Sequence, residues 1–166
     1  MIFDRAALNR YVIGLAKALY TRGFEVTGPI AEFDDSGDMV FSIAGVAVGE
    51  RGVRISLDEL WRPLPERRWE RDEYTYDLVD EPRRRRRAFH LHDRALAAAR
   101  LRSVVHEHCE EVLGRPACGH YLGREIPDGY VAIELLAAAW LEPSTLGCGD
   151  LVCLDRSRTD PGSATS

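Results

Sequence analysis

The sequence predicts an α+β fold, in which an antiparallel β-sheet of about five or six strands is packed by an N-terminal and a C-terminal helix. Three observations lead to this prediction. Apolar residues recur at helical spacing near both ends of the chain, the middle alternates between apolar and polar residues, and short polar turns separate the alternating segments. A sheet with one apolar face needs helices to cover that face. We expect one domain over 1–155 and a disordered polar tail over 156–166.

The first expected element is a helix over residues 4–21. The Asp4 carboxylate is suited to accept from the free N–H groups of the first turn, and Gly23 is suited to end the helix. The apolar residues of its buried stripe are Leu8, Tyr11, Val12, Leu15 and Leu19. This stripe predicts that the helix lies against the sheet.

The strands of the sheet follow this helix. Five segments with extended or alternating character are expected as strands, at 25–33, 39–48, 53–58, 74–79 and 87–92. The polar segment 34–38 is a turn signal. We expect 61–68 to be a connection, because Pro63 and Pro65 cannot donate to a sheet ladder.

The segment 93–113 fits two structures. Its apolar residues recur at helical spacing, with Asp93 as a cap and Gly114 as a stop. Residues 104–109 also alternate like a strand. A closing helix over 128–141 is clear, because Pro127 and Asp128 open it and Pro143 lies beyond its end.

Composition limits the classes of protein to consider. The chain has 166 residues with 45% hydrophobic residues, 30% charged residues and a net charge of −5, as expected for a globular domain that is not generally coated by polyanions. We expect no membrane partner, because no apolar run approaches the ~18 residues that a span needs. A basic leader with an apolar core is not found at the N-terminus, so we expect a cytoplasmic protein.

Four cysteines, Cys109, Cys118, Cys148 and Cys153, carry no Cys-x-x-Cys spacing. In a reducing cytosol we expect them to be free thiols. A zinc site built from Cys109, Cys118 and His120 is one alternative, with His106 or His108 as a further ligand. Buried cysteines of a small core are the more common outcome for such spacing.

Histidines give the strongest functional signal. Four of the five form two His-x-His pairs, His90 with His92 and His106 with His108. In a strand, residues i and i+2 point to the same face, so two adjacent strands would gather four imidazoles on one patch. Such a patch suits either a divalent metal ion or metal-free acid–base catalysis on a phosphodiester. We therefore predict these four residues as catalytic groups or metal ligands.

An arginine run precedes the first histidine pair. Arg83 to Arg87 are consecutive, and clustered guanidinium groups neutralise phosphates. We predict Arg85, Arg86 and Arg87 as phosphate-binding residues beside the histidines, with RNA as the partner. The alternative is a solvated hairpin turn, whose positive charge is diluted by Asp77, Asp80 and Glu81.

The order of elements in 74–140 resembles the TumE-like toxins of bacterial toxin–antitoxin pairs. The residues that carry the resemblance are Tyr74, Tyr76, Arg87, His106, His108, Glu110, Tyr121 and the helix from Ala132 to Trp140. This resemblance implies a cytoplasmic toxin, a ribonuclease, that is neutralised by a cognate antitoxin protein. It also favours the strand over 103–109, which we therefore expect.

Two other classes of function fit the same sequence. One is a non-catalytic interaction module, such as an antitoxin, an immunity protein or an accessory subunit. The other is a metal-dependent enzyme that acts on a small molecule, which requires a deep pocket beside the metal. The position of the histidines in space distinguishes these classes, because an interaction module has no need to gather them.

Overall fold

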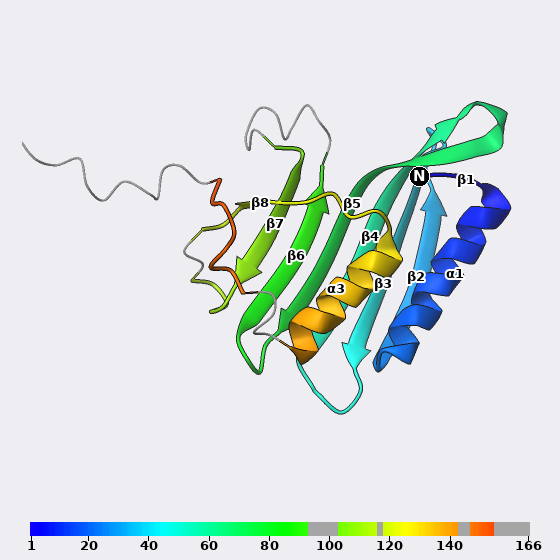
Figure 1. Ribbon diagram of the computed structural model, residues 1–166. Helices are drawn as coiled ribbons and strands as arrows, with labels where there is room; N and C mark the ends of the chain where they lie inside the picture. The colour runs from blue at the N-terminus through cyan, green and yellow to red at the C-terminus, as the bar shows by residue number, and fades with distance from the viewer. Residues whose placement is uncertain (93–102, 116–117, 143–146, 155–166) are drawn as a thin grey trace, which may run out of the picture.

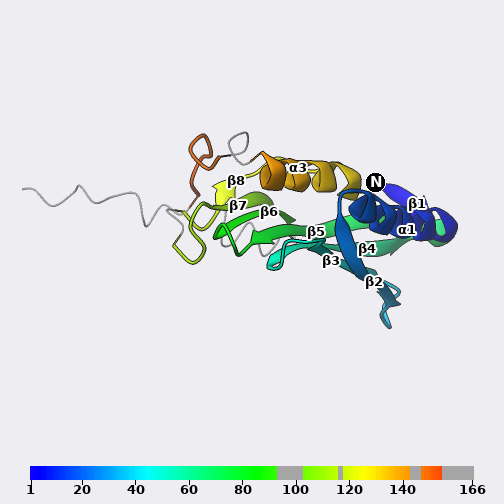
Figure 2. The same cartoon turned by 90° about the horizontal axis from the view of Figure 1, so that it is seen from below.

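The computed structural model describes residues 1–92, 103–115, 118–142 and 147–154 (Figure 1). In chain order the elements are β1 (Ile2–Asp4), α1 (Arg5–Thr21), β2 (Phe24–Phe33), β3 (Met39–Ala47), β4 (Val53–Leu64), the 3-10 turn η1 (Pro65–Arg67), β5 (Arg68–Asp80), β6 (Arg85–Leu91), β7 (Val105–Glu110), β8 (Tyr121–Leu122) and α3 (Gly129–Leu141). The strands form one antiparallel sheet, and both helices lie on the same face of it (Figure 2). The α+β prediction is confirmed. The predicted disordered tail over 156–166 lies outside the described residues.

The sheet is a meander, in which each strand pairs with the one before it. Its order is β2-β3-β4-β5-β6-β7-β8, and β1 pairs with the beginning of β5. The eight described strands exceed the predicted five or six because β1 and β8 have only three and two residues. Segments this short carry no measurable periodicity, so the sequence could not indicate them.

Helix α1 forms as its sequence predicts. The Asp4 carboxylate accepts a hydrogen bond from the Ala7 N–H at 2.7 Å, and Gly23 adopts a φ of +86° after the last turn. All five residues of the predicted stripe are buried. The closing helix α3 begins in the same way, with the Asp128 carboxylate accepting from the Val131 N–H at 2.9 Å.

The prediction that 61–68 is a connection is wrong for most of its length. Strand β4 continues through Pro63 to Leu64, and only 65–67 form the turn to β5. Strand β3 begins at Met39, opposite Trp61, so among the described residues Pro63 pairs with β5 alone and has an unpaired edge on its other side. A proline is tolerated at an edge because no ladder partner needs its missing N–H.

Strand β7 settles part of the ambiguity over 93–113. Residues 105–110 are extended and pair with β6 over six positions, so the strand is confirmed there and a helix is excluded. Residues 93–102 lie outside the described residues. Strand β7 carries the second histidine pair.

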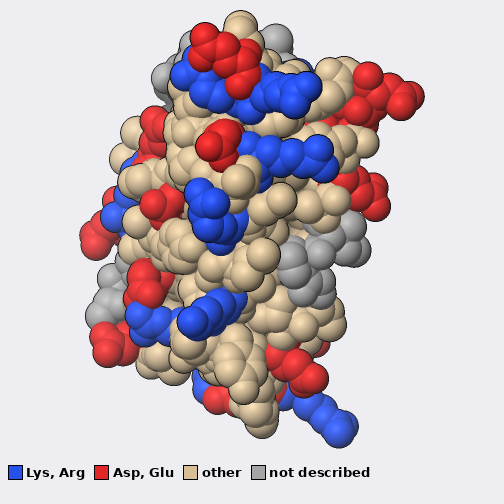
Figure 3. All heavy atoms as spheres, turned by 90° about the vertical axis from the view of Figure 1, so that its right-hand side faces the viewer, with Lys and Arg blue, Asp and Glu red and all other residues tan. Residues whose placement is uncertain are grey.

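The main core lies between the helices and one face of the sheet. It contains the stripe of α1, the inward residues of β3 to β6 and the buried residues of α3. On the other face, alternate residues of β3 and β4 are exposed or half-buried, as the predicted one-sided sheet requires. Seen from the side of α1, positively and negatively charged side chains are interspersed (Figure 3).

A buried carboxylate joins the sheet to α1 inside this core. Glu59 is 2% exposed and accepts hydrogen bonds from Tyr11 Oη at 2.7 Å, Trp61 Nε1 at 2.8 Å and Tyr76 Oη. Burial raises the pKa of Glu59. Tyr11 Oη also accepts from the Gly129 N–H, so the network connects α1 with the beginning of α3.

Within the described residues, neither helix is long and apolar enough to cross a membrane.

Candidate metal centre

The two His-x-His pairs lie side by side on neighbouring strands. His90 of β6 is directly opposite His106 of β7, and Ala88 is opposite His108. Because side chains alternate along a strand, His90, His106 and His108 share the face of the sheet that the helices do not cover. His92 follows β6, and its N–H donates to the Val104 carbonyl at 3.1 Å, which continues the ladder.

His106 is the centre of a five-histidine cluster, which consists of His90, His92, His106, His108 and His120. Its ring centroid lies 4.9 Å from His90, 5.0 Å from His92, 5.1 Å from His108 and 5.3 Å from His120. The four predicted histidines are therefore together in space. The fifth, His120, precedes β8 and also packs on His108, at 4.9 Å between ring centroids.

Three of these imidazoles have the spacing of a metal-ligand set. One ring nitrogen from each of His90, His106 and His108 lies within 4.8 Å of the other two. His90 is 8% exposed, His106 is 1% exposed and His108 is half-buried. His90 Nε2 and His106 Nδ1 are buried and have no hydrogen-bond partner among the described residues. A buried nitrogen without a partner costs free energy, and a bound cation would remove that cost.

The three imidazoles stay neutral at physiological pH. Burial, together with the neighbouring histidines, lowers the pKa of His90 to about 2 and that of His106 to about 3. Burial and the nearby Arg86 guanidinium lower the pKa of His108 to about 4. Neutral imidazoles have free lone pairs, as metal ligation requires. General acid–base catalysis works best with a pKa near the operating pH, so this arrangement suits it less.

The scaffold fixes the histidine at the centre from both sides. The backbone of His106 pairs with β6 on one side and with Leu122 of β8 on the other side. Gly123 comes directly after β8 and lies very near the backbone of β7. A Cβ at this position would be 2.8 Å from the His106 carbonyl carbon. Glycine is therefore required at 123 for the close approach of the two backbones. The sequence contained no sign of this contact.

The three arginines predicted to bind phosphate all have carboxylate partners. Arg87 forms a buried ion pair with Glu107, and Arg85 contacts Asp80 at 3.4 Å. The Arg86 guanidinium donates to both Asp77 oxygens at 3.0 Å and below, and lies 3.5 Å from a Glu110 oxygen. A phosphate would have to displace or share these partners. The phosphate-binding role stays a prediction.

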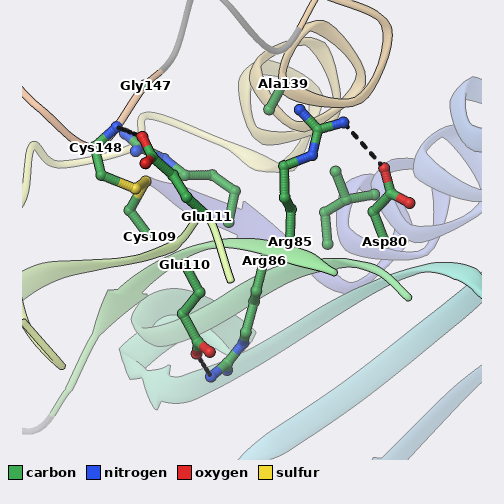
Figure 4. A pocket seen from close by; sticks show the side chains of 11 residues that line it. Asp80, Arg85, Arg86, Cys109, Glu110, Glu111, Ala139, Gly147 and Cys148 are labelled. Carbon is green, nitrogen blue, oxygen red and sulfur yellow. Dashed lines mark hydrogen bonds and ion pairs between the residues drawn. A yellow bond between two sulfur atoms is a disulfide. The ribbon is translucent and has the colours of Figure 1, made fainter. Parts of the chain in front are cut away.

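The three arginines also lie on two different faces. Arg86 and Glu110 share the face of the histidines, whereas Arg85 extends toward α3 on the opposite face (Figure 4). On the helix side, a pocket of about 380 Å³ is lined by Arg85, Arg87 and Ala139, among others. The sheet separates this pocket from the five-histidine cluster.

Acidic residues lie near the cluster on its own face. Asp77 and Glu110 flank Arg86 next to His108. A groove of about 160 Å³ that includes His92 is also lined by Asp58 and Glu73. Asp77 and Glu110 are paired with Arg86, whose guanidinium disfavours positive charge on His90 and His108, so Asp58 and Glu73 are the acidic groups near the cluster that this guanidinium does not pair with. These acidic residues lie on strands β4, β5 and β7 and were not singled out in the sequence as a group.

The expectation that the four cysteines are free thiols is wrong. Cys109 pairs with Cys148, and Cys118 pairs with Cys153. Partners are 39 and 35 residues apart, so only the tertiary structure brings them together. The pairing also removes the alternative zinc site, because Cys109 and Cys118 offer no thiolate while they are in disulfides.

Comparison of the chain with protein-family models, curated proteins and solved structures gives no significant match. The resemblance to the TumE-like toxins therefore stays a prediction.

Proposed function

We propose that this protein binds one divalent transition-metal ion through the imidazoles of His90, His106 and His108. The observation that carries the proposal is the pair of buried ring nitrogens without partners, one on His90 and one on His106, within ligand distance of His108. Among the described residues, no other group of histidines, cysteines or carboxylates has this spacing.

The ligand chemistry narrows the choice of metal. Imidazole nitrogen suits Zn²⁺, Cu²⁺ and Ni²⁺, whereas Mg²⁺, Ca²⁺ and Mn²⁺ prefer oxygen. Asp58 and Glu73 add negative charge in the groove beside His92, whereas Asp77 and Glu110 are paired with Arg86. These carboxylates supply no selectivity, so the histidines themselves decide which metal is retained.

Metal-dependent hydrolysis is the second candidate function. Three protein ligands leave a coordination position for water, and a bound Zn²⁺ lowers the pKa of that water to near 7. His108 is only half-buried, which favours access to the ion from the open face of the sheet. Cleavage of RNA by a toxin is the form of this activity that the sequence predicts, with an antitoxin as protein partner.

The charge of the site supports small substrates more than RNA. The predicted phosphate-binding residues Arg85, Arg86 and Arg87 are already neutralised by carboxylates. A polyanion would also approach the acidic groups around the cluster unfavourably. The cytoplasmic location is likewise a prediction only, and two disulfides favour an oxidising compartment instead.

Titration of the metal-free protein with ZnCl₂ in a calorimeter tests the proposal. We expect one equivalent to bind, and we expect His90→Ala and His106→Ala each to lose most of the affinity. Ser42→Ala, an uncharged half-buried residue on the same face of the sheet, is the matched control and should bind within a small factor of wild type. The proposal is wrong if wild type binds no stoichiometric zinc, nickel or copper while remaining folded by circular dichroism.

The hydrolytic candidate has its own test. We expect cleavage of a single-stranded RNA, or of a small phosphodiester, to require the metal and to be lost in His108→Ala. Failure of both substrates with the loaded protein would remove hydrolysis of phosphodiesters and leave metal binding intact.

A further inference from the structure

The strand β8 next to the metal centre is held by a segment from the end of the described chain. Its two residues pair with β7 through Leu122 opposite His106 and Tyr121 opposite Glu107. On its other side, the Leu122 N–H donates to the Val152 carbonyl at 2.7 Å. A two-residue strand has little stability of its own, so its position depends on this second contact.

The same segment holds the backbone of His120. The Leu154 N–H donates to the His120 carbonyl at 2.8 Å, and the backbones of Cys153 and Tyr121 form an isolated antiparallel β-bridge. The Cys118–Cys153 disulfide links this segment covalently to Cys118, which lies two positions before His120. The disulfide therefore holds the chain on both sides of His120, at Cys118 through the covalent bond and at Tyr121 through the β-bridge of Cys153. This stretch places the His120 ring against His106 and His108.

We propose that the Cys118–Cys153 disulfide is a redox modification site, whose reduction by a dithiol weakens metal binding at the histidine cluster. This inference rests on the proposed metal site. Opening the bridge releases 151–154 from β8, and the His120 ring then loses its fixed position over His106 and His108. The metal site would then lose the support of β8 beside His106 and the neighbouring His120 imidazole.

The chemistry of this step is thiol–disulfide exchange. A thiolate of the dithiol attacks the Cys153 sulfur, because Cys153 is half-buried whereas Cys118 is 3% exposed. The S–S bond breaks, the Cys118 thiolate leaves and takes up a proton, and a mixed disulfide remains on Cys153. The second thiol of the reductant then displaces Cys153 as a thiol. The protein gains two electrons and two protons, and the dithiol becomes a disulfide.

The second disulfide provides a matched control. Cys109–Cys148 ties 147–148 to the helix-side face of β7, beside the pocket of Figure 4. Six ladder positions with β6 already fix β7, so the imidazoles of His106 and His108 do not depend on this bridge. Its removal should leave the metal site intact.

The test compares zinc affinities by competition with a chromophoric chelator. Serine variants are used because free thiols of the reduced protein would bind zinc themselves. We expect Cys118→Ser/Cys153→Ser to bind zinc about ten-fold or more weakly than oxidised wild type, a loss typical of disturbed support around metal ligands. We expect His120→Ala to show a similar loss and Cys109→Ser/Cys148→Ser to bind as wild type does.

Equal affinities of wild type and Cys118→Ser/Cys153→Ser would overturn this inference and leave the metal site standing. Absence of zinc binding by wild type itself would overturn both. If the double serine variant does not fold, hydrogen exchange of metal-free wild type decides. Reduction with dithiothreitol should then accelerate exchange of the Leu122 amide and leave that of Leu78 in the core unchanged, and an unchanged Leu122 amide would contradict the inference.

Discussion

His90 and His106 face each other across the β6–β7 ladder, and each has a buried ring nitrogen that no described group satisfies. In the metal-free protein this pair is a destabilising feature, because an unpaired buried polar group costs about 1–3 kcal/mol. Proteins tolerate such features at functional sites, where stability and activity compete.

Replacing the central histidine should separate stability from metal binding. We expect His106→Leu to raise the free energy of unfolding of the metal-free protein by about 1–3 kcal/mol, since a buried polar group without a partner is removed. Wild type should gain about 2.7 kcal/mol at a zinc concentration of 100 times Kd, and the variant should gain nothing. Urea unfolding with and without zinc measures both quantities. A variant that is still stabilised by zinc would exclude His106 as a ligand.

The metal-free protein should lose stability in mild acid. The folded-state pKa values of His90, His106 and His108 lie at about 2, 3 and 4, well below the value near 6.5 of an unfolded chain. Below pH 6.5 the unfolded chain takes up protons that the folded protein cannot. The stabilising contribution is therefore complete above pH 6.5 and decreases as the pH falls toward 4.

Other ionisable groups also face these rings. They are His92, His120, Arg86, Asp77 and Glu110. Comparison of wild type with His106→Leu isolates the contribution of the central ring. We expect the variant to have a shallower decrease of unfolding free energy between pH 6.5 and 4, and parallel curves would show that His106 does not titrate as described.

The glycine after β8 should be sensitive to a single methyl group. In Gly123→Ala the new Cβ meets the His106 backbone at 2.8–2.9 Å, where neither atom can move easily. We expect a loss of about 1–3 kcal/mol in unfolding free energy and a weaker zinc affinity. Gly149→Ala is the control, because a Cβ there meets nothing within 4 Å. Equal thermal stability of the two variants would show that β8 is not held against His106.

The buried carboxylate of the core should be essential for stability but not for metal binding. Glu59→Leu leaves the Tyr11, Trp61 and Tyr76 donors without their acceptor. It also leaves the buried Arg71 guanidinium, 3.9 Å from Glu59, without its carboxylate, and we expect a loss of about 3–5 kcal/mol. Glu25→Leu on the exposed side of β2 should change stability by no more than about 0.5 kcal/mol. Urea unfolding distinguishes these outcomes, and zinc affinity of the folded fraction should stay unchanged.

Local patterns in the sequence were sufficient for most of the elements. The stripe of α1, the cap at Asp4 and the alternation of 53–58 depend on neighbours within a few residues, and the structure confirms them. The extent of β4 depends on its neighbours in the sheet. Pro63 is compatible with a strand only because β3, which begins opposite Trp61, does not extend alongside it, and no local pattern reveals this.

The sequence by itself determined that the two histidines of each His-x-His pair share a face if their segment is a strand, because side chains alternate along every strand. Only the tertiary structure decided that the two pairs meet, that His120 joins them and that the cysteines pair. Each of these depends on the register between strands or on contacts across 35 or more residues. Such contacts follow from the packing of the whole sheet, which a local pattern does not contain.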